Sequence, residues 1–164
     1  PDVLIVQTHS HLVLDHLGQL QALGERCALR VQVSIETDRE ELPGLPAPFS
    51  SIDSRFEAAR RLREAGIETV VTVSPLLPIR NEEVFFERIA ECADAVVLDH
   101  FIGGDGSPSG SRTRRTPLPA KMESLQPGST ELSYRDRMVE LARRRFPGRV
   151  GVGIDGFAGR YLPD

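Results

Sequence analysis

Four side chains with complementary chemistry lie in one stretch of the chain. Ser34 and Glu36 come at the end of a run of apolar, β-branched residues. Arg55 follows a proline-rich segment, and Ser74 ends a second apolar run. If the two runs form adjacent parallel strands, these side chains gather at the carboxyl-terminal edge of the sheet, where α/β proteins bind ligands. The pattern therefore predicts a ligand-binding site at this edge.

The elements that must position these side chains alternate along the chain. Continuous apolar runs are typical of strands buried on both faces, and apolar residues three or four apart are typical of amphipathic helices. The predicted strands cover residues 3–8, 29–36, 67–74, 95–101 and 150–154. The predicted helices cover residues 11–23, 51–65, 81–92 and 131–146, with Ser51 or Asp53 and Asn81 as amino-terminal caps.

Two segments are predicted to lack regular structure. The first, residues 42–50, carries Pro43, Pro46 and Pro48 around Gly44 and is expected to be a rigid loop. The second, residues 103–130, is rich in Gly, Ser and Pro and is expected to be a long flexible loop.

The order of elements predicts the fold class. Four strand–helix units followed by a strand, (βα)₄β, indicate an α/β fold with parallel strands and right-handed crossovers. Residues 1–164 are enough for a single domain, and the pattern fits half of an α/β barrel or a small open sheet. Because Pro1 and Asp2 lead directly into an apolar strand, we expect a fragment of a barrel whose amino-terminal half is missing.

Composition excludes several classes of protein. The net charge of −4 argues against nucleic-acid binding by bulk charge, and no apolar run approaches the roughly 20 residues of a membrane span. Cys27 and Cys92 are too few and too far apart for a disulfide framework or a thiolate metal site. A cytoplasmic protein that binds no membrane is expected.

The central stretch also resembles a known family. The segment contains VSIETDREEL, then PAPFSSIDSRFEAARRLREAGIETVVTVSPLLP. It is similar to the radical S-adenosylmethionine (radical SAM) superfamily, in particular to its spore photoproduct lyase-like members. The matching positions are Val33–Thr37, Arg55, Leu62–Ile67 and Pro75–Pro78. The opening LIVQTHSHLVLDH is similar to the preceding strand and helix of that family, with His9 where a basic residue often stands.

This resemblance implies part of a TIM-type (β/α)₆ barrel that binds S-adenosylmethionine against a four-iron four-sulfur cluster. Ser34 and Glu36 would lie near the ribose or the methionine ammonium group, and Arg55 would bind the methionine carboxylate. The backbone around Ser74 would line the adenine. An external electron donor would reduce the cluster, and the substrate stays open.

One feature of the family is missing from the sequence. The cluster is held by C-x-x-x-C-x-x-C, and this chain has no such motif. Cys27 and Cys92 cannot replace three closely spaced thiolates. The cluster ligands are therefore expected in a segment upstream of this chain, and the chain alone is expected to be inactive. No catalytic residue and no metal ligand are assigned within it.

Two other functions fit parts of the sequence. His9 and His11 at the end of a strand have the spacing of barrel metallohydrolases, and Asp99, His100 and Asp155 are also expected at strand ends. A non-catalytic α/β ligand-binding domain is the second alternative. The basic run of Arg112, Arg114 and Arg115 would suit DNA as a partner, but a solvated, mobile loop is the favoured explanation.

Overall fold

The computed structural model describes residues 2–43, 45 and 47–163. Its centre is one five-stranded parallel sheet with the strand order β1-β2-β3-β4-β5. The strands are β1 (Val3–Thr8), β2 (Ala28–Ser34), β3 (Glu68–Val73), β4 (Ala95–Leu98) and β5 (Val150–Val152). The predicted α/β class and the parallel sheet are confirmed.

The four predicted helices follow the first four strands in the predicted order. They are η1 (His11–His16) with α1 (Leu17–Gly24), α2 (Ile52–Glu64), α3 (Glu82–Cys92) and α6 (Leu132–Arg145). The structure adds α4 (Phe101–Gly104), η2 (Thr113–Arg115) and α5 (Leu118–Leu125) between β4 and α6, and α7 (Gly153–Phe157) after β5. The Ser51 hydroxyl accepts from Ser54 N and the Asn81 side chain accepts from Val84 N, so both residues cap helices as predicted.

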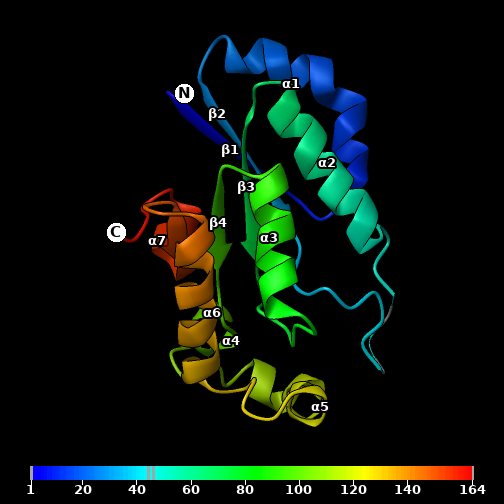
Figure 1. Ribbon diagram of the computed structural model, residues 1–164, viewed down its shortest axis with the longest axis vertical. Helices are drawn as coiled ribbons and strands as arrows, with labels where there is room; N and C mark the ends of the chain where they lie inside the picture. The colour runs from blue at the N-terminus through cyan, green and yellow to red at the C-terminus, as the bar shows by residue number, and fades with distance from the viewer. Residues whose placement is uncertain (1, 44, 46, 164) are drawn as a thin grey trace.

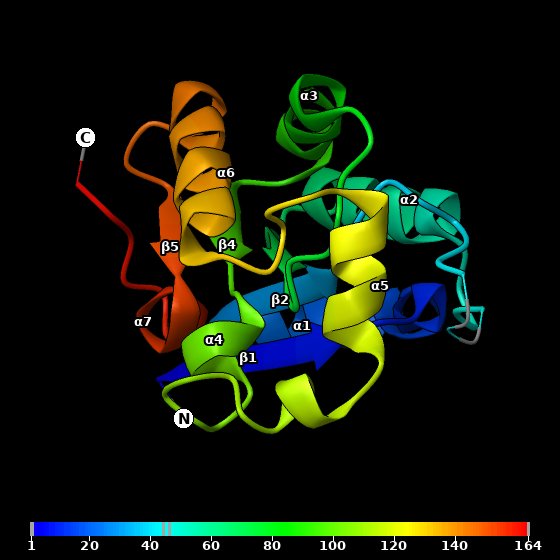
Figure 2. The ribbon, with the colours of Figure 1, turned by 90° about the horizontal axis from the view of Figure 1, so that it is seen from below.

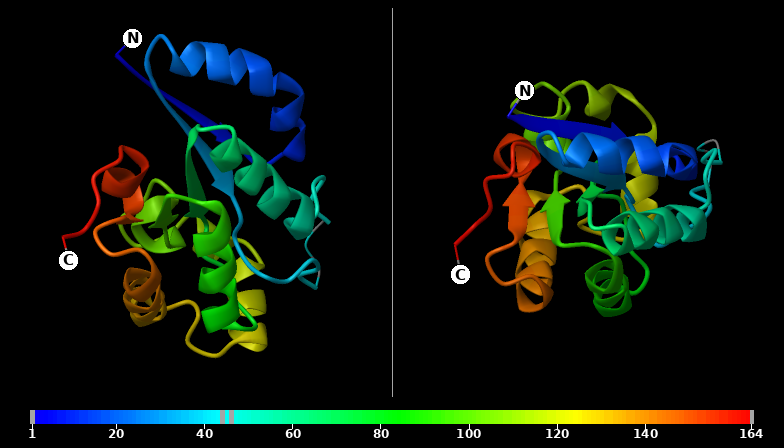
Figure 3. Two further views of the ribbon diagram at one scale, coloured as in Figure 1. Left: turned by 45° about the horizontal axis from the view of Figure 1, so that its top comes forward. Right: turned by 90° about the horizontal axis from the view of Figure 1, so that it is seen from above.

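The two faces of the sheet have different chemistry. On one face, apolar residues of every strand form the main core with α1, α2, α3 and α6. Figures 1 and 3 show these four helices following one another along the outside of the twisted sheet. The other face carries the buried polar residues Gln32, Ser34 and Thr72. Towards β5 it also carries a small apolar cluster that contacts Phe157 and Tyr161.

Several predicted boundaries are wrong. β4 ends at Leu98, so Asp99 and His100 leave the sheet before α4. β5 ends at Val152 because α7 begins at Gly153. The predicted helix over residues 11–23 is divided into η1 and α1. β1 is not buried on both faces: it forms one edge of the described sheet, and Val3 is 58% exposed.

The segment over residues 103–130 is not the structureless loop that its composition predicts. It contains η2 and α5, and Met122 of α5 is buried against Leu77 and Phe101. Figure 2 shows α5 beside the arrowhead of β1, and α4 begins at Phe101, shortly after β4 ends at Leu98. Residues 44 and 46 of the predicted proline-rich loop lie outside the described residues.

Candidate functional site

The ends of β2, β3 and β4 are joined by backbone hydrogen bonds at the carboxyl-terminal edge of the sheet. Ile35 N donates to Thr72 O over 2.9 Å, and Leu77 N donates to Glu36 O over 3.1 Å. Asp99 N donates to Val73 O over 3.1 Å. These bonds bring the residues that follow each strand close together, as expected for neighbouring parallel strands.

Glu36 and Arg55 form an ion pair at this edge, in which Arg55 is buried and Glu36 is half-buried. Arg55 lies in the first turn of α2, and its Nη1 donates to Glu36 Oε2 and to Ser34 O, both over 2.7 Å. Arg55 is only 3% exposed, and its buried Nε has no hydrogen-bond partner among the described residues. Arg55 is therefore a buried residue, although it lies in the first turn of a helix.

His9 lies on the solvent side of the same carboxylate. Its Nδ1 is 3.0 Å from Glu36 Oε1, and its side chain is 70% exposed. Glu36 is therefore held between a buried guanidinium and an exposed imidazole. A carboxylate has about four lone-pair positions, so this arrangement leaves it able to accept a further hydrogen bond.

The Ser34 hydroxyl points to the polar face of the sheet and not to Arg55. It lies 2.9 Å from the hydroxyl of Thr72, which the sheet register places directly opposite it on β3. Ser34 is 6% exposed. Its backbone carbonyl, which accepts from Arg55, is the part of the residue that belongs to the ion-pair site.

Ser74 belongs to a different group. Its hydroxyl donates to Asp99 Oδ2 over 3.2 Å, and burial is the main cause that raises the pKa of the Asp99 carboxyl above its usual range. The sequence indicates Asp99 only as a metal ligand of the alternative hydrolase. The four predicted site residues thus divide into Ser34, Glu36 and Arg55 on one side and Ser74 with Asp99 on the other.

Each of these two groups lines a cavity. A cavity of about 150 Å³ is bounded by Glu36, Arg55 and Leu77 together with residues of the 39–48 segment. A second cavity, of about 210 Å³, is bounded by Ser74, Asp99 and residues of α4, η2 and α5. Both cavities lie at the edge where the sequence predicts ligand binding.

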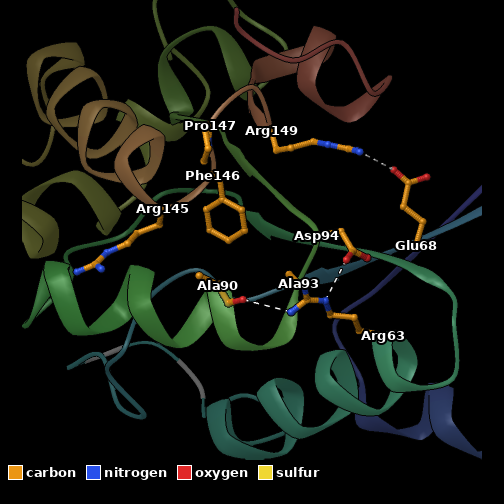
Figure 4. Close-up of a pocket in the computed structure, with 9 residues that line it drawn as sticks. All are labelled: Arg63, Glu68, Ala90, Ala93, Asp94, Arg145, Phe146, Pro147 and Arg149. Carbon is orange, nitrogen blue, oxygen red and sulfur yellow. Dashed lines mark hydrogen bonds and ion pairs between the residues drawn. The ribbon is translucent and has the colours of Figure 1, made fainter. Parts of the chain in front are cut away.

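A larger hollow lies at the opposite, amino-terminal edge (Figure 4). Its basic side chains are engaged with acidic ones: Arg63 Nε donates to Asp94 Oδ1 over 2.9 Å, and Arg149 Nη1 lies 3.8 Å from Glu68 Oε1. Figure 4 shows the side chain of Arg145 directed away from this group. The arginines therefore do not converge on one anion, and the hollow offers no comparable site.

The histidines of the alternative hydrolase centre do not converge on one site, because each of them binds a different partner. His11 Nδ1 lies 2.9 Å from Ser50 Oγ, whereas His9 binds Glu36. His100 is buried and its Nδ1 accepts from Ile102 N, which leaves the proton on Nε2 beside Ser129 O. Over residues 2–43, 45 and 47–163, no group of three or more His, Cys, Asp or Glu side chains could hold a metal ion.

The cysteines do not approach each other or the candidate site. Cys27 precedes β2 and Cys92 ends α3, so both lie towards the amino-terminal edge of the sheet. Burial raises the pKa of the Cys92 thiol to about 12, which disfavours the thiolate that iron would need. An iron–sulfur cluster therefore does not fit the cysteines of this chain.

The basic residues considered for DNA lie on the segment around η2. Arg114 Nε donates to Ser109 O over 3.1 Å, and its guanidinium lies 5.5 Å from the ring centre of Phe101. Arg115 is exposed. The cluster therefore includes at least one arginine that serves the local structure.

Comparison with known proteins assigns no family, because neither family models nor curated protein sequences match the chain. None of the helices in the described part of the chain is long and apolar enough to cross a membrane. The chemistry of the carboxyl-terminal edge is therefore the basis on which a function can be inferred.

Proposed function

We propose that these residues form part of the S-adenosylmethionine-binding wall of a radical SAM enzyme. The observation that carries the proposal is the Glu36–Arg55 pair, which lies at the carboxyl-terminal edge of adjacent parallel strands and beside a cavity of about 150 Å³. Both residues belong to the stretch that resembles the family. A barrel-type ligand site is built from this edge.

The side chains complement the amino-acid end of the cofactor. Arg55 Nε is a buried donor without an acceptor among the described residues, and a methionine carboxylate would supply one. Glu36 can accept from an ammonium group or a ribose hydroxyl. The cavity is too small for a nucleoside as well, so the adenosyl part would lie outside it.

The order of the strands supports the finer assignment to half of a barrel. In doubly wound folds the strand order reverses and helices cover both faces of the sheet. Here the order is sequential, and α1, α2, α3 and α6 contribute to one core on one face. A partial (β/α)₆ barrel has the same arrangement, with its polar inner face directed towards the ligand.

The proposal places the iron–sulfur cluster on another segment of the protein, since Cys27 and Cys92 do not fit it. When bound, S-adenosylmethionine would supply a 5′-deoxyadenosyl radical, formed by one-electron cleavage of its C–S bond with release of methionine, and this radical would remove hydrogen from a substrate. The residues of this chain hold the cofactor in position and exclude water around it.

The test uses the complete protein, reconstituted anaerobically, and compares Glu36→Gln with Glu57→Gln. Glu57 is an exposed glutamate of α2, and its substitution leaves the edge unchanged. We expect Glu36→Gln to weaken S-adenosylmethionine binding by about 1–3 kcal/mol, as for hydrogen bonds to charged groups, and Glu57→Gln to have no effect. Equal affinities of both variants and the unmodified protein would contradict the assignment of Glu36.

Two further results decide the class of enzyme. The reduced complete protein is expected to form 5′-deoxyadenosine, and its gene to encode C-x-x-x-C-x-x-C on the order of 60–90 residues before Pro1. Absence of that motif would end the radical SAM proposal. One equivalent of zinc that is lost in His9→Ala or His11→Ala would favour the hydrolase instead.

A further inference from the structure

The cavity beside Asp99, here named the Asp99 pocket, lies between the ends of β3 and β4 and the segment that contains α4 and η2. Its volume is about 210 Å³, and Pro75, Phe101 and Leu118 contribute apolar walls. Pockets for whole small molecules are larger, about 300–1,000 Å³. The Asp99 pocket is therefore of the size that receives one group of a larger ligand.

One oxygen of the Asp99 carboxylate, a residue that lines this pocket, is free to accept a hydrogen bond. Oδ2 accepts from Ser74 Oγ, whereas Oδ1 accepts no hydrogen bond from any described residue and is not a buried atom. Gly104 lies against the carboxylate: a Cβ at this position would be 2.5 Å from Oδ2. The absence of a side chain at Gly104 therefore allows the backbone of α4 to lie closer to the Asp99 carboxylate than any other residue would.

The charges of the residues that line the pocket favour a cation. Its described lining contains two carboxylates, Asp99 and Asp105, and neither lysine nor arginine. Hydrogen bonds from Ser107 and Thr113 lower the pKa of Asp105, so it keeps its charge. The cation that acts on Asp99 is Arg135, whose guanidinium pairs with Asp136 over 2.6 Å.

Asp99 thus has no ion-pair partner among the described residues, and its pKa is raised because burial outweighs the hydrogen bond from Ser74 and the charge of Arg135. A ligand that brings a positive charge to Oδ1 would supply that partner, while a short apolar stem would contact Phe101 and Leu118. An anion would meet two carboxylates and is disfavoured.

We propose that the Asp99 pocket binds a primary ammonium group carried on a short apolar stem, and that this group belongs to the substrate. The assignment to a substrate rests on the proposed function. The binding of an amine to the pocket does not, because it requires neither the cluster nor S-adenosylmethionine.

The test measures binding of n-butylammonium to the complete protein by saturation-transfer NMR, with n-butanol and butyrate as neutral and anionic probes of similar length. We expect n-butylammonium to bind at least tenfold more tightly than n-butanol, and butyrate not to bind. Asp99→Asn, which keeps the shape of the side chain, is expected to remove the preference for the amine. Asp53→Asn, a change of an exposed aspartate on α2, should preserve it.

Gly104→Ala provides a second variant, because the added methyl group meets the Asp99 carboxylate. It should weaken amine binding without the loss of a charge, and circular dichroism should show an unchanged fold. Equal affinities for amine and alcohol, or an amine affinity unaffected by Asp99→Asn, would overturn the proposal.

Adenosine distinguishes the substrate from the cofactor, since the exocyclic amine of adenine is another nitrogen donor. Amine binding that persists in saturating adenosine supports a substrate subsite. Displacement by adenosine that depends on Asp99 would assign the pocket to the cofactor and overturn the substrate assignment. Failure of amine binding leaves the Glu36 test unaffected, so the two proposals fail separately.

Discussion

Arg55 and Glu36 join α2 to the end of β2 through an ion pair that is largely shielded from solvent. Arg55 Nη1 lies 2.7 Å from Glu36 Oε2, and the two side chains are 4% and 14% exposed. The same nitrogen donates to Ser34 O. Because removal of one member of such a pair leaves the other charge buried, the pair should matter for stability as well as for ligand binding.

Arg55→Met is expected to lower the free energy of unfolding by about 3 kcal/mol, because Glu36 and the Ser34 carbonyl both lose their donor. Urea denaturation followed by circular dichroism measures the change. Arg61→Met on the exposed side of the same helix is the matched control, with an expected change within about 0.5 kcal/mol. Similar losses of unfolding free energy in both variants would show that the ion pair contributes no more to stability than an exposed arginine does.

Asp99→Asn should stabilise the protein at neutral pH. Burial raises the pKa of Asp99 in the folded state, so folding favours its protonated form and the charged form opposes folding. The unfavourable contribution of Asp99 is therefore present at neutral pH and fades as the pH falls through its folded pKa. Unfolding curves from pH 7 down to the usual aspartate pKa of about 3.9 should show the advantage of the variant shrinking. A stability gain of the variant that does not change with pH would show that burial of the Asp99 charge is not the cause.

Gly156→Ala should be strongly destabilising, because α7 approaches β5 at two glycines. A Cβ on Gly156 would lie 2.6 Å from the carbonyl carbon of Gly151, which is backbone and cannot rotate away. Thermal unfolding of Gly156→Ala is compared with that of Gly18→Ala on α1, where nothing lies within 4 Å of the added atom. The Gly18 variant should be neutral or stabilising by up to about 1 kcal/mol.

Removal of the hydroxyl group is expected to lower the free energy of unfolding at Tyr134 but not at Tyr161. Tyr134 Oη accepts from Ile79 N over 3.1 Å and donates to Leu77 O, so Tyr134→Phe leaves a buried amide without its acceptor. A loss of about 1–3 kcal/mol in unfolding free energy is expected. The buried Tyr161 hydroxyl has no partner among the described residues, so Tyr161→Phe should be neutral or stabilising. Losses of equal size would refute this distinction.

Much of the fold could be predicted because its signals are local. Ser51 and Asn81 cap the helices they precede, and the apolar positions Phe56, Ala59 and Leu62 form the buried face of α2. The alternation of strands and helices is enough to predict the parallel sheet, since short crossover connections allow few other arrangements.

The errors occur where tertiary contacts override local composition. α5 lies in a segment of low complexity, and its Met122 is buried against Leu77 and Phe101, from the segments that follow β3 and β4. β4 stops at Leu98 because Asp99 turns towards Ser74 and His100 caps the turn of α4 through Ile102 N. No pattern within either segment carries this information.

For the candidate site, the sequence alone determined that Ser34, Glu36, Arg55 and Ser74 stand at the ends of strands or in the first turn of a helix, because periodicity and caps are properties of neighbouring residues. Only the tertiary structure decided their partners. The register of β2 against β3 sets Ser34 opposite Thr72, and the packing of α2 buries Arg55 against Glu36. Such pairings join residues about 20 to 40 positions apart, and the free energy of burying them depends on the whole sheet and its helices.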